Sequence, residues 1–267
     1  MSAKIEGVDT QDFEDRTVGL VTSYYPDLDA TRLPIALDTL KNYRDADIPI
    51  VMVDASPEAE VRARFRELGA IVLHAPDLGL ATSAIAGAEF IRANGGDRII
   101  KHEPEKTLIP KFADVINEAL DVNEAVVIGR TPEAIATLPT TQRETEAIGG
   151  RLMAEHLGIP ADSLSGGRAF ARTGTDELIN YDHGKWGDNW MHLHIPIIDS
   201  IRKGHKVGGV RVPLIHPEQM TQEEEGDPSF DNKRAMQLQL HTDLINRYLK
   251  ENPSYKELVE QVKKKAQ

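Results

Sequence analysis

Two glutamates separated by a proline are the residues of this chain with the clearest capacity for chemistry. Glu103 and Glu105 directly follow an apolar run in the segment "DRIIKHEPEKTL" (residues 97–108). Pro104 favours extended backbone at residue 103, and in an extended chain residues two positions apart point to the same side. We therefore expect the two carboxylates to share one small volume, where each raises the pKa of the other unless a cation lies between them. A divalent ion held there could also bind a diphosphate.

A second interpretation of the same acids needs no metal. Both glutamates would favour the N-terminus of a helix that begins near Thr107. Lys101 and Lys106 would then be their ion-pair partners. The spacing alone does not decide between a metal site and a helix terminus.

The elements that must position these acids are short apolar runs rich in Val and Ile. They cover residues 17–25, 48–56, 70–76, 97–103 and 124–130. Helical patterns lie between them, at residues 32–46, 57–69, 80–96 and 108–121. This alternation predicts an α/β fold with a mostly parallel, Rossmann-like sheet and helices on both faces.

Polar residues follow these runs, at the edge of the sheet where open α/β folds bind their ligands. They are Thr22, Ser23, Tyr24, Asp54, His74, Asp77, Glu103 and Glu105. Any one of them could be a helix cap or a turn residue. Together they predict a binding site along one edge.

The regular alternation of strand and helix patterns ends after residue 130. A helical stretch at 140–158 precedes "LSGGRAFAR" (164–172), a helix-like segment at 188–203 and an apolar run at 206–216. Beyond Thr221 we expect an acidic loop over 222–230, a helix over about 231–250 and a short terminal helix. We predict a flexible segment at 1–15, one catalytic domain at 16–220, and a C-terminal helical extension at 221–267 that packs on the same domain.

The composition of the chain limits the kinds of partner and site that it can have. The chain has 267 residues, 40% of them hydrophobic, which is enough for one large domain with a substantial core. Its net charge of −12 disfavours nucleic acid as a partner, and the lack of cysteine excludes disulfides, thiolate metal sites and thiol nucleophiles. No apolar stretch reaches the length of a membrane span, so we expect a cytoplasmic protein. Formation of a homo-oligomer stays open.

The order of these features resembles the nucleotide-diphospho-sugar glycosyltransferases of GT-A fold, especially the inverting, family-two type. The resemblance rests on a first strand ending in polar residues, an aspartate after the second, "APDLGLATSAIAGAEFIRANGGDRIIKHEPE" and a later "WGDNW". It covers about residues 16–217 as an ordered series of elements, and no single motif in it is diagnostic.

On the donor side, the resemblance implies a set of nucleotide and metal contacts. The nucleoside would contact Thr22, Ser23, Tyr24 and Asp54, and the nucleotide would lie near Asp77 and Gly79. The family's Asp-x-Asp metal motif corresponds here to Glu103-Pro104-Glu105, and His216 would complete the shell of a Mg or Mn ion. The glutamates depart from the family pattern, and Lys106 beside them could itself neutralise phosphate.

On the acceptor side, the resemblance makes Asp188 the general base that removes the acceptor's hydroxyl proton. Asp188 lies between the only two tryptophans, Trp186 and Trp190, whose indole rings could stack on a sugar. Gly167 and Arg168 would approach the acceptor or a phosphate closely. Each also has a structural interpretation: Asp188 as a helix cap, the two tryptophans as core residues, and Gly167 as part of a bulge before a strand.

Three functions follow from this set of residues. The first is a glycosyltransferase that moves a sugar from a nucleoside-diphosphate sugar to an unknown acceptor hydroxyl, assisted by a metal and with inversion. The second is a sugar-1-phosphate nucleotidyltransferase, although the first strand leads into "TSYYPDLDATRLP" and not into a glycine-rich phosphate loop. The third is a non-catalytic protein that binds a nucleotide sugar or a carbohydrate on the same scaffold.

Overall fold

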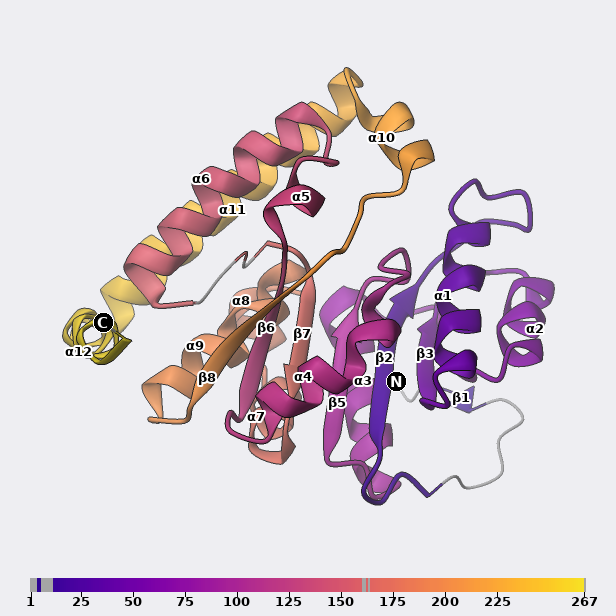
Figure 1. Cartoon of the computed structure of the whole chain (residues 1–267), viewed down its shortest axis with the longest axis horizontal. Coiled ribbons are helices and arrows are strands. Elements are labelled where there is room, and N and C mark those ends of the chain that lie inside the picture. The colour runs from indigo at the N-terminus through magenta and orange to yellow at the C-terminus, as the bar shows by residue number, and fades with distance from the viewer. Residues whose placement is uncertain (1–3, 6–11, 160–161, 163, 267) are drawn as a thin grey trace.

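A single eight-stranded sheet runs through the part of the chain that the computed structural model describes, residues 4–5, 12–159, 162 and 164–266 (Figure 1). Its strand order is β1-β4-β3-β2-β5-β7-β6-β8. The strands are β1 (Lys4–Ile5), β2 (Thr17–Ser23), β3 (Ile50–Asp54), β4 (Ile71–His74), β5 (Arg98–His102), β6 (Ala125–Arg130), β7 (Gly167–Phe170) and β8 (Val207–Val212). The five predicted apolar runs are β2 to β6, so this part of the prediction is confirmed.

The direction of the strands creates one long binding edge. β2 runs parallel to β3 and β5, β3 parallel to β4, and β6 parallel to β8. β7 runs antiparallel to both β5 and β6, so β5 and β6 point the same way. The carboxyl ends of six strands therefore lie on the same edge, and the predicted mostly parallel sheet is confirmed.

Helices cover both faces of the sheet because its strands are apolar on both sides. In β3, Val51 and Val53 pack in the core that contains α3, whereas Ile50 and Met52 pack in the core that contains α1 and α2. The longer helices are α1 (Leu33–Asp45), α2 (Ala59–Glu67), α3 (Leu80–Ala93), α4 (Ala113–Leu120), α6 (Thr140–Leu157), α7 (Arg172–Ile179), α9 (Ile195–Arg202), α11 (Pro228–Glu251) and α12 (Tyr255–Ala266). The short ones are η1 (Ile109–Phe112), α5 (Pro132–Ile135), α8 (His183–Trp186), η2 (Trp190–Leu193) and α10 (Glu218–Glu224).

The acidic stretch that we expected as a loop is largely helical. α10 covers its beginning, and α11 starts at Pro228 after a turn with Gly226 at φ 75°. The Asp227 carboxylate accepts a hydrogen bond from the backbone N–H of Ser229 (2.9 Å), and Pro228 fits the first helical turn. The predicted loop over 222–230 is therefore wrong, because its Asp-Pro pair begins a helix.

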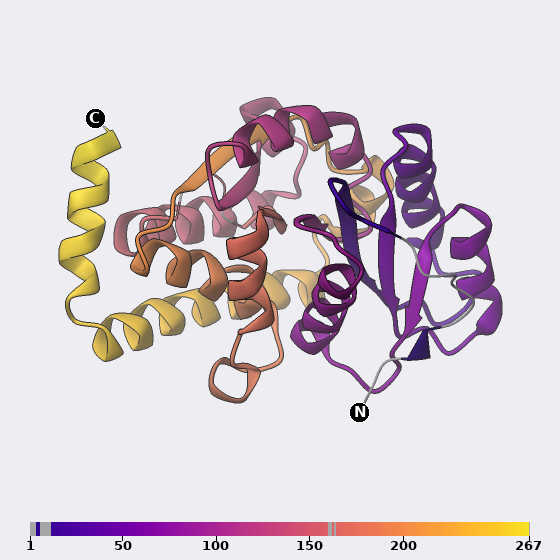
Figure 2. The same ribbon diagram turned by 90° about the horizontal axis from the view of Figure 1, so that it is seen from below.

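The C-terminal helices extend the molecule away from its N-terminal half. α11 runs along α6, and α12 lies at the opposite end of the molecule from α1 and α2 (Figures 1 and 2). The expected domain limit at residue 220 falls inside α10. The expected N-terminal segment 1–15 lies mostly outside the described residues, and within it Lys4–Ile5 pairs with β4. In the described residues, no helix combines the length and apolar character needed to cross a membrane.

Candidate functional site

Glu103 and Glu105 lie in a β-turn. The backbone N–H of Lys106 donates to the carbonyl oxygen of Glu103 (3.0 Å), with Pro104 at the second position that such turns favour. Glu103 Oε2 lies 3.5 Å from Lys106 Nζ, whereas Glu105 Oε1 lies 3.5 Å from the Tyr25 hydroxyl. The extended geometry expected for residues 103–105 is therefore wrong, because the proline closes a turn and gives the two carboxylates different partners.

A buried tyrosine and histidine fix the start of this turn. His102 Nδ1 lies 2.7 Å from the carbonyl oxygen of Glu103, and because a carbonyl only accepts, this nitrogen carries the proton. His102 Nε2 then accepts from the Tyr43 hydroxyl, 2.6 Å away. Burial lowers the pKa of His102 to about 4, so its ring is neutral at neutral pH. Gly19 on β2 leaves the space that the Tyr43 ring occupies.

Helix α1 also fixes the rest of the turn. The Thr39 hydroxyl donates to the carbonyl oxygen of Pro104, and Asn42 Nδ2 donates to that of Thr107 (2.8 Å). Because both donors lie on one face of α1, the helix holds the turn from behind and leaves its other side open to the cavity in front.

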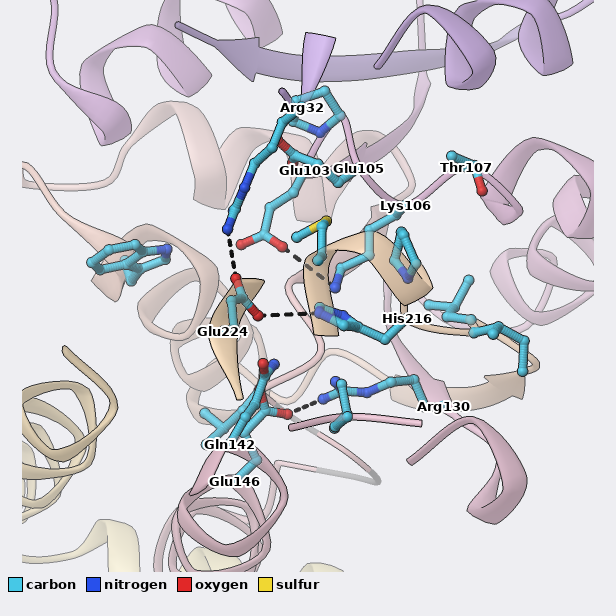
Figure 3. A pocket seen from close by; sticks show the side chains of 18 of the residues that line it. Arg32, Glu103, Glu105, Lys106, Thr107, Arg130, Gln142, Glu146, His216 and Glu224 are labelled. Atoms are coloured by element: carbon cyan, nitrogen blue, oxygen red, sulfur yellow. Dashed lines mark hydrogen bonds and ion pairs between the residues drawn. The ribbon is translucent and has the colours of Figure 1, made fainter. Parts of the chain in front are cut away.

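That cavity measures about 220 Å³ and lies at the carboxyl ends of β2 and β5 (Figure 3). We call it the first cavity. Its cationic lining residues are Arg32, Lys101, Lys106, Arg130, Lys233 and Arg234. Its carboxylates are Glu103, Glu105, Glu146 and Glu224. An excess of cations in a chain of net charge −12 favours a polyanionic ligand in this cavity.

Sequence reasoning named Lys101 only as an ion-pair partner of the glutamates and not as a contact to a ligand. Its side chain is buried on β5, where it is paired in register with Arg168 on β7. Burial, followed by the charge of Arg168, lowers the pKa of Lys101 to about 8, although Glu103 opposes this shift. Two buried cations on neighbouring strands are costly without an anion. A lysine inside the apolar run "DRIIKHE" was the available signal.

Arg130 joins the sheet to helix α6. Only 1% of its side chain is exposed, and it forms ion pairs with Glu146 on α6 and with Asp162 (Nε to Oδ2, 2.6 Å). Arg234 on α11 donates to Gln142 Oε1 on α6 (2.8 Å). These contacts hold α6 and α11 as the second wall of the first cavity.

The two glutamates have opposite electrostatic environments. Burial acts to raise the pKa of Glu103, but Lys106 and Lys101 outweigh it, and this pKa is lowered overall. Burial and the charge of Glu103 raise the pKa of Glu105. Glu103 therefore stays ionised at neutral pH, with its side chain 41% exposed.

The three expected metal ligands, Glu103, Glu105 and His216, all line the first cavity. His216 Nε2 lies 3.1 Å from Glu224 Oε2, and Arg32 contacts the other oxygen of Glu224 at 2.6 Å (Figure 3). Within the described residues, no group of three or more His, Asp and Glu side chains is arranged to hold a metal ion. In this structure the three side chains contact other residues: Glu103 contacts Lys106, Glu105 lies beside Tyr25, and His216 pairs with Glu224 of α10. The residues present do not fit a divalent ion held by this set.

Asp188 lies outside the lining of the first cavity and of a smaller cavity that adjoins it. It caps helix α3. Its Oδ1 accepts from the backbone N–H groups of Ala81 (2.6 Å) and Thr82 (3.2 Å) at the start of α3. Its Oδ2 accepts from the Thr82 hydroxyl (2.6 Å), and Gly79 leaves room for the carboxylate. Burial opposes these hydrogen bonds, which nevertheless lower the pKa of Asp188. The structure thus shows Asp188, the predicted base, as a cap of α3 that lies outside the lining of both cavities.

The predicted nucleoside residues divide into two groups. Thr22 and Tyr24 line the first cavity. Ser23 instead donates to Oδ1 of the buried Asp54 (2.6 Å), outside that lining. Asp77 and Gly79 are exposed before α3 and also lie outside the lining.

The predicted acceptor residues also divide. Arg168 is buried and donates to the carbonyl oxygens of Leu193 (2.8 Å) and Gly167 (2.7 Å). Neither Gly167 nor Arg168 is among the lining residues of the first cavity or of the smaller cavity that adjoins it. Trp186 packs against Tyr248 of α11, with ring centroids 6.0 Å apart. Trp190 alone of this set lines the first cavity.

A second, smaller cavity of about 50 Å³ adjoins the first. Six residues line both cavities, and two of them, Glu103 and Glu146, are carboxylates at the junction. Glu146 is paired with the buried Arg130, which leaves Glu103 as the more accessible carboxylate there. The arrangement places a cation-lined space beside an ionised carboxylate that could accept a proton from a group in the second cavity.

No protein-family model and no curated protein matches the sequence. Among solved structures, glucosyl-3-phosphoglycerate synthase from Mycobacterium tuberculosis in complex with uridine-diphosphate is 14% identical, with 90% of this chain and 86% of that chain covered and a TM-score of 0.50. The same enzyme in complex with phosphoglyceric acid is 15% identical, over 77% of this chain and 74% of that one, with a TM-score of 0.50. 4-Diphosphocytidyl-2C-methyl-D-erythritol synthase from Anaerococcus prevotii is 12% identical over 83% and 96%, with a TM-score of 0.48. The first two likenesses confirm the predicted GT-A-like fold.

Replacing the capping carboxylate should destabilise the protein. We expect Asp188→Ala to lower the free energy of unfolding at pH 7 by about 1 kcal/mol, because two N–H groups of α3 lose their acceptor. Since the folded-state pKa of Asp188 is lowered, this contribution is present above the unfolded-state pKa and is lost as the pH falls through the folded-state value. Urea unfolding at several pH values measures it.

The matched control is Asp77→Ala, an exposed carboxylate before the same helix, which should change stability by less than about 0.5 kcal/mol. Equal stabilities of Asp188→Ala and the unmodified protein at pH 7 would contradict the capping role.

Proposed function

We propose that the protein is a glycosyltransferase that uses a nucleoside-diphosphate sugar. The observation that carries this proposal is the cation-lined first cavity, at the strand edge where α/β folds bind ligands. The diphosphate would lie against Lys101 and Lys106, with the nucleoside toward Thr22 and Tyr24. Two solved structures that share this fold are of an enzyme whose complexes contain uridine-diphosphate and phosphoglyceric acid.

In the proposed reaction Glu103 is the general base. The acceptor hydroxyl would give its proton to the Glu103 carboxylate while its oxygen forms a bond to the anomeric carbon of the sugar. The bond from that carbon to the diphosphate oxygen breaks, and the electron pair leaves with the nucleoside diphosphate. Lys101 and Lys106 would stabilise the negative charge that develops on the leaving group. A single displacement of this kind inverts the anomeric carbon.

A screen of nucleoside diphosphates and their sugars by thermal shift tests the proposal, because a ligand that binds the folded state raises its stability. We expect a nucleoside diphosphate to raise the Tm with EDTA present, since side chains supply the positive charge. The sugar donor so identified should then release nucleoside diphosphate. Pyrophosphate release from a nucleoside triphosphate and a sugar 1-phosphate, without turnover of any sugar donor, would favour nucleotidyl transfer instead.

The pH dependence of donor binding tests Lys101. Because its pKa in the free protein is about 8, the charge that attracts a diphosphate is present below pH 8 and is lost above it. We expect the Kd for the nucleoside diphosphate to rise about tenfold between pH 7 and pH 9, as linkage to one proton requires. Calorimetry measures this change.

In Lys101→Met, binding should be weaker at pH 7 and should no longer depend on pH in this range. An unaltered pH profile in this variant, with an unchanged Tm, would exclude Lys101 from the donor site.

The two glutamates provide a matched pair for testing the base. Glu103→Gln should lower turnover by at least about 100-fold, the usual contribution of a general base, and should keep donor affinity within a few-fold. Glu105→Gln should keep turnover within a few-fold, because this carboxylate lies beside Tyr25 and outside the junction of the cavities. Steady-state kinetics compare them, and similar rates for both variants would remove Glu103 from the role of base.

A further inference from the structure

The second cavity has apolar walls and a polar far side. It lies between η2, α6 and α11, and its apolar lining residues are Leu164, Trp190, Met191, Leu193, Leu238 and Leu240. At about 50 Å³ it has room for roughly four water-sized groups. The charged residues Glu103, Glu146 and Arg234 also line it. Glu103 contacts Lys106, Glu146 is paired with Arg130, and Arg234 donates to Gln142. Because each of these charges has a protein partner and the other walls are apolar, the cavity suits an uncharged group.

A chain of hydrogen bonds determines which nitrogen of His241 carries a proton. Arg168 Nη2 lies 3.4 Å from His194 Nδ1, and a guanidinium only donates, so His194 Nδ1 accepts. The proton of the neutral His194 ring is then on Nε2, which lies 3.1 Å from Nε2 of His241. His241 Nε2 must accept this hydrogen bond. The proton of His241 is therefore on Nδ1.

This N–H group has no protein partner within the described part of the chain. His241 is 7% exposed and lines the second cavity, and its Nδ1 makes no hydrogen bond there. Burial lowers the pKa of His241 to about 4, so the ring does not gain a second proton at neutral pH. A buried donor without an acceptor is costly, and an oxygen atom of a ligand would remove this cost.

We propose that the second cavity is the acceptor subsite and takes a small, uncharged acceptor with two oxygens. One is the hydroxyl that faces Glu103 at the junction with the first cavity. The other is a ketone, ether or hydroxyl oxygen that accepts from His241 Nδ1. The carbon atoms between them pack against the leucines and Trp190. The assignment as an acceptor subsite rests on the proposed function, whereas the binding site itself does not.

Two probes of similar chain length test this inference. 4-Hydroxybutan-2-one carries a hydroxyl and a ketone, whereas butan-1-ol carries the hydroxyl alone. We expect the ketone to bind about tenfold more tightly in ligand-observed NMR titrations, because butan-1-ol leaves the buried N–H unpaired. Saturating pyrophosphate should not displace it, since an acceptor must bind beside the donor.

Two variants of His241 separate a binding role from a structural one. His241→Phe removes the donor, and the preference for the ketone should fall to about onefold. His241→Asn places an amide N–H near the position of Nδ1 and should restore most of the preference. The ratio of two affinities in one variant does not depend on its stability, and the Tm of each variant confirms that it is folded.

Equal affinity of both probes for the unmodified protein, or an unchanged ratio in His241→Phe, would overturn the binding site. Displacement of the ketone by pyrophosphate would overturn its assignment as an acceptor subsite. None of these measurements uses a sugar donor. A protein that binds no nucleoside-diphosphate sugar would therefore refute the proposed function without changing the outcome for His241.

Discussion

The candidate site depends on the β-turn at residues 103–106 and on the hydrogen bonds that hold it from behind. Tyr43 and Thr39 on α1 both contribute, the first through His102 and the second directly at Pro104. These contacts are buried, where a hydrogen bond is stronger and its loss leaves an unpaired polar group. The turn places Glu103 at the junction of the two cavities and Glu105 beside Tyr25 in the first cavity, so it also sets the different pKa values of the two carboxylates.

Buried ion pairs form the wall that faces this turn. Arg130, at the end of β6, connects the sheet to α6 through Glu146, and Arg32, beside α1, connects to α10 through Glu224. Removing one partner of such a pair would leave an uncompensated buried charge. Helices that are far from the first strands in the sequence are thus fixed around one space, which the parallel sheet alone would leave open.

The sequence predicted the sheet well, because strands that are buried on both faces have a simple apolar pattern. It also predicted that Thr22, Tyr24, Glu103, Glu105 and Lys106 lie at one edge of the sheet, and all five line the first cavity. The pattern could not decide whether Pro104 extends the chain or closes a turn, because both conformations have the same φ at proline. That choice is made by α1.

The sequence also could not show which side chains contact residues far away in the chain. Asp188 accepts hydrogen bonds from α3, 106 and 107 residues away in the sequence, and no local pattern around "WGDNW" indicates this partner. His216 likewise pairs with Glu224, which belongs to a segment that we expected to be a loop. In both cases the residue type was compatible with chemistry, and tertiary contacts gave it another role.

The position of the diphosphate is the most direct test of the account. A crystal structure of the protein with the nucleoside diphosphate that gives the largest increase in Tm would locate it. We expect its phosphate oxygens within hydrogen-bonding distance of Lys101 and Lys106, and Glu103 still at the junction of the two cavities. Phosphates bound outside the first cavity, or a complex in which the turn at 103–106 has opened, would contradict the account.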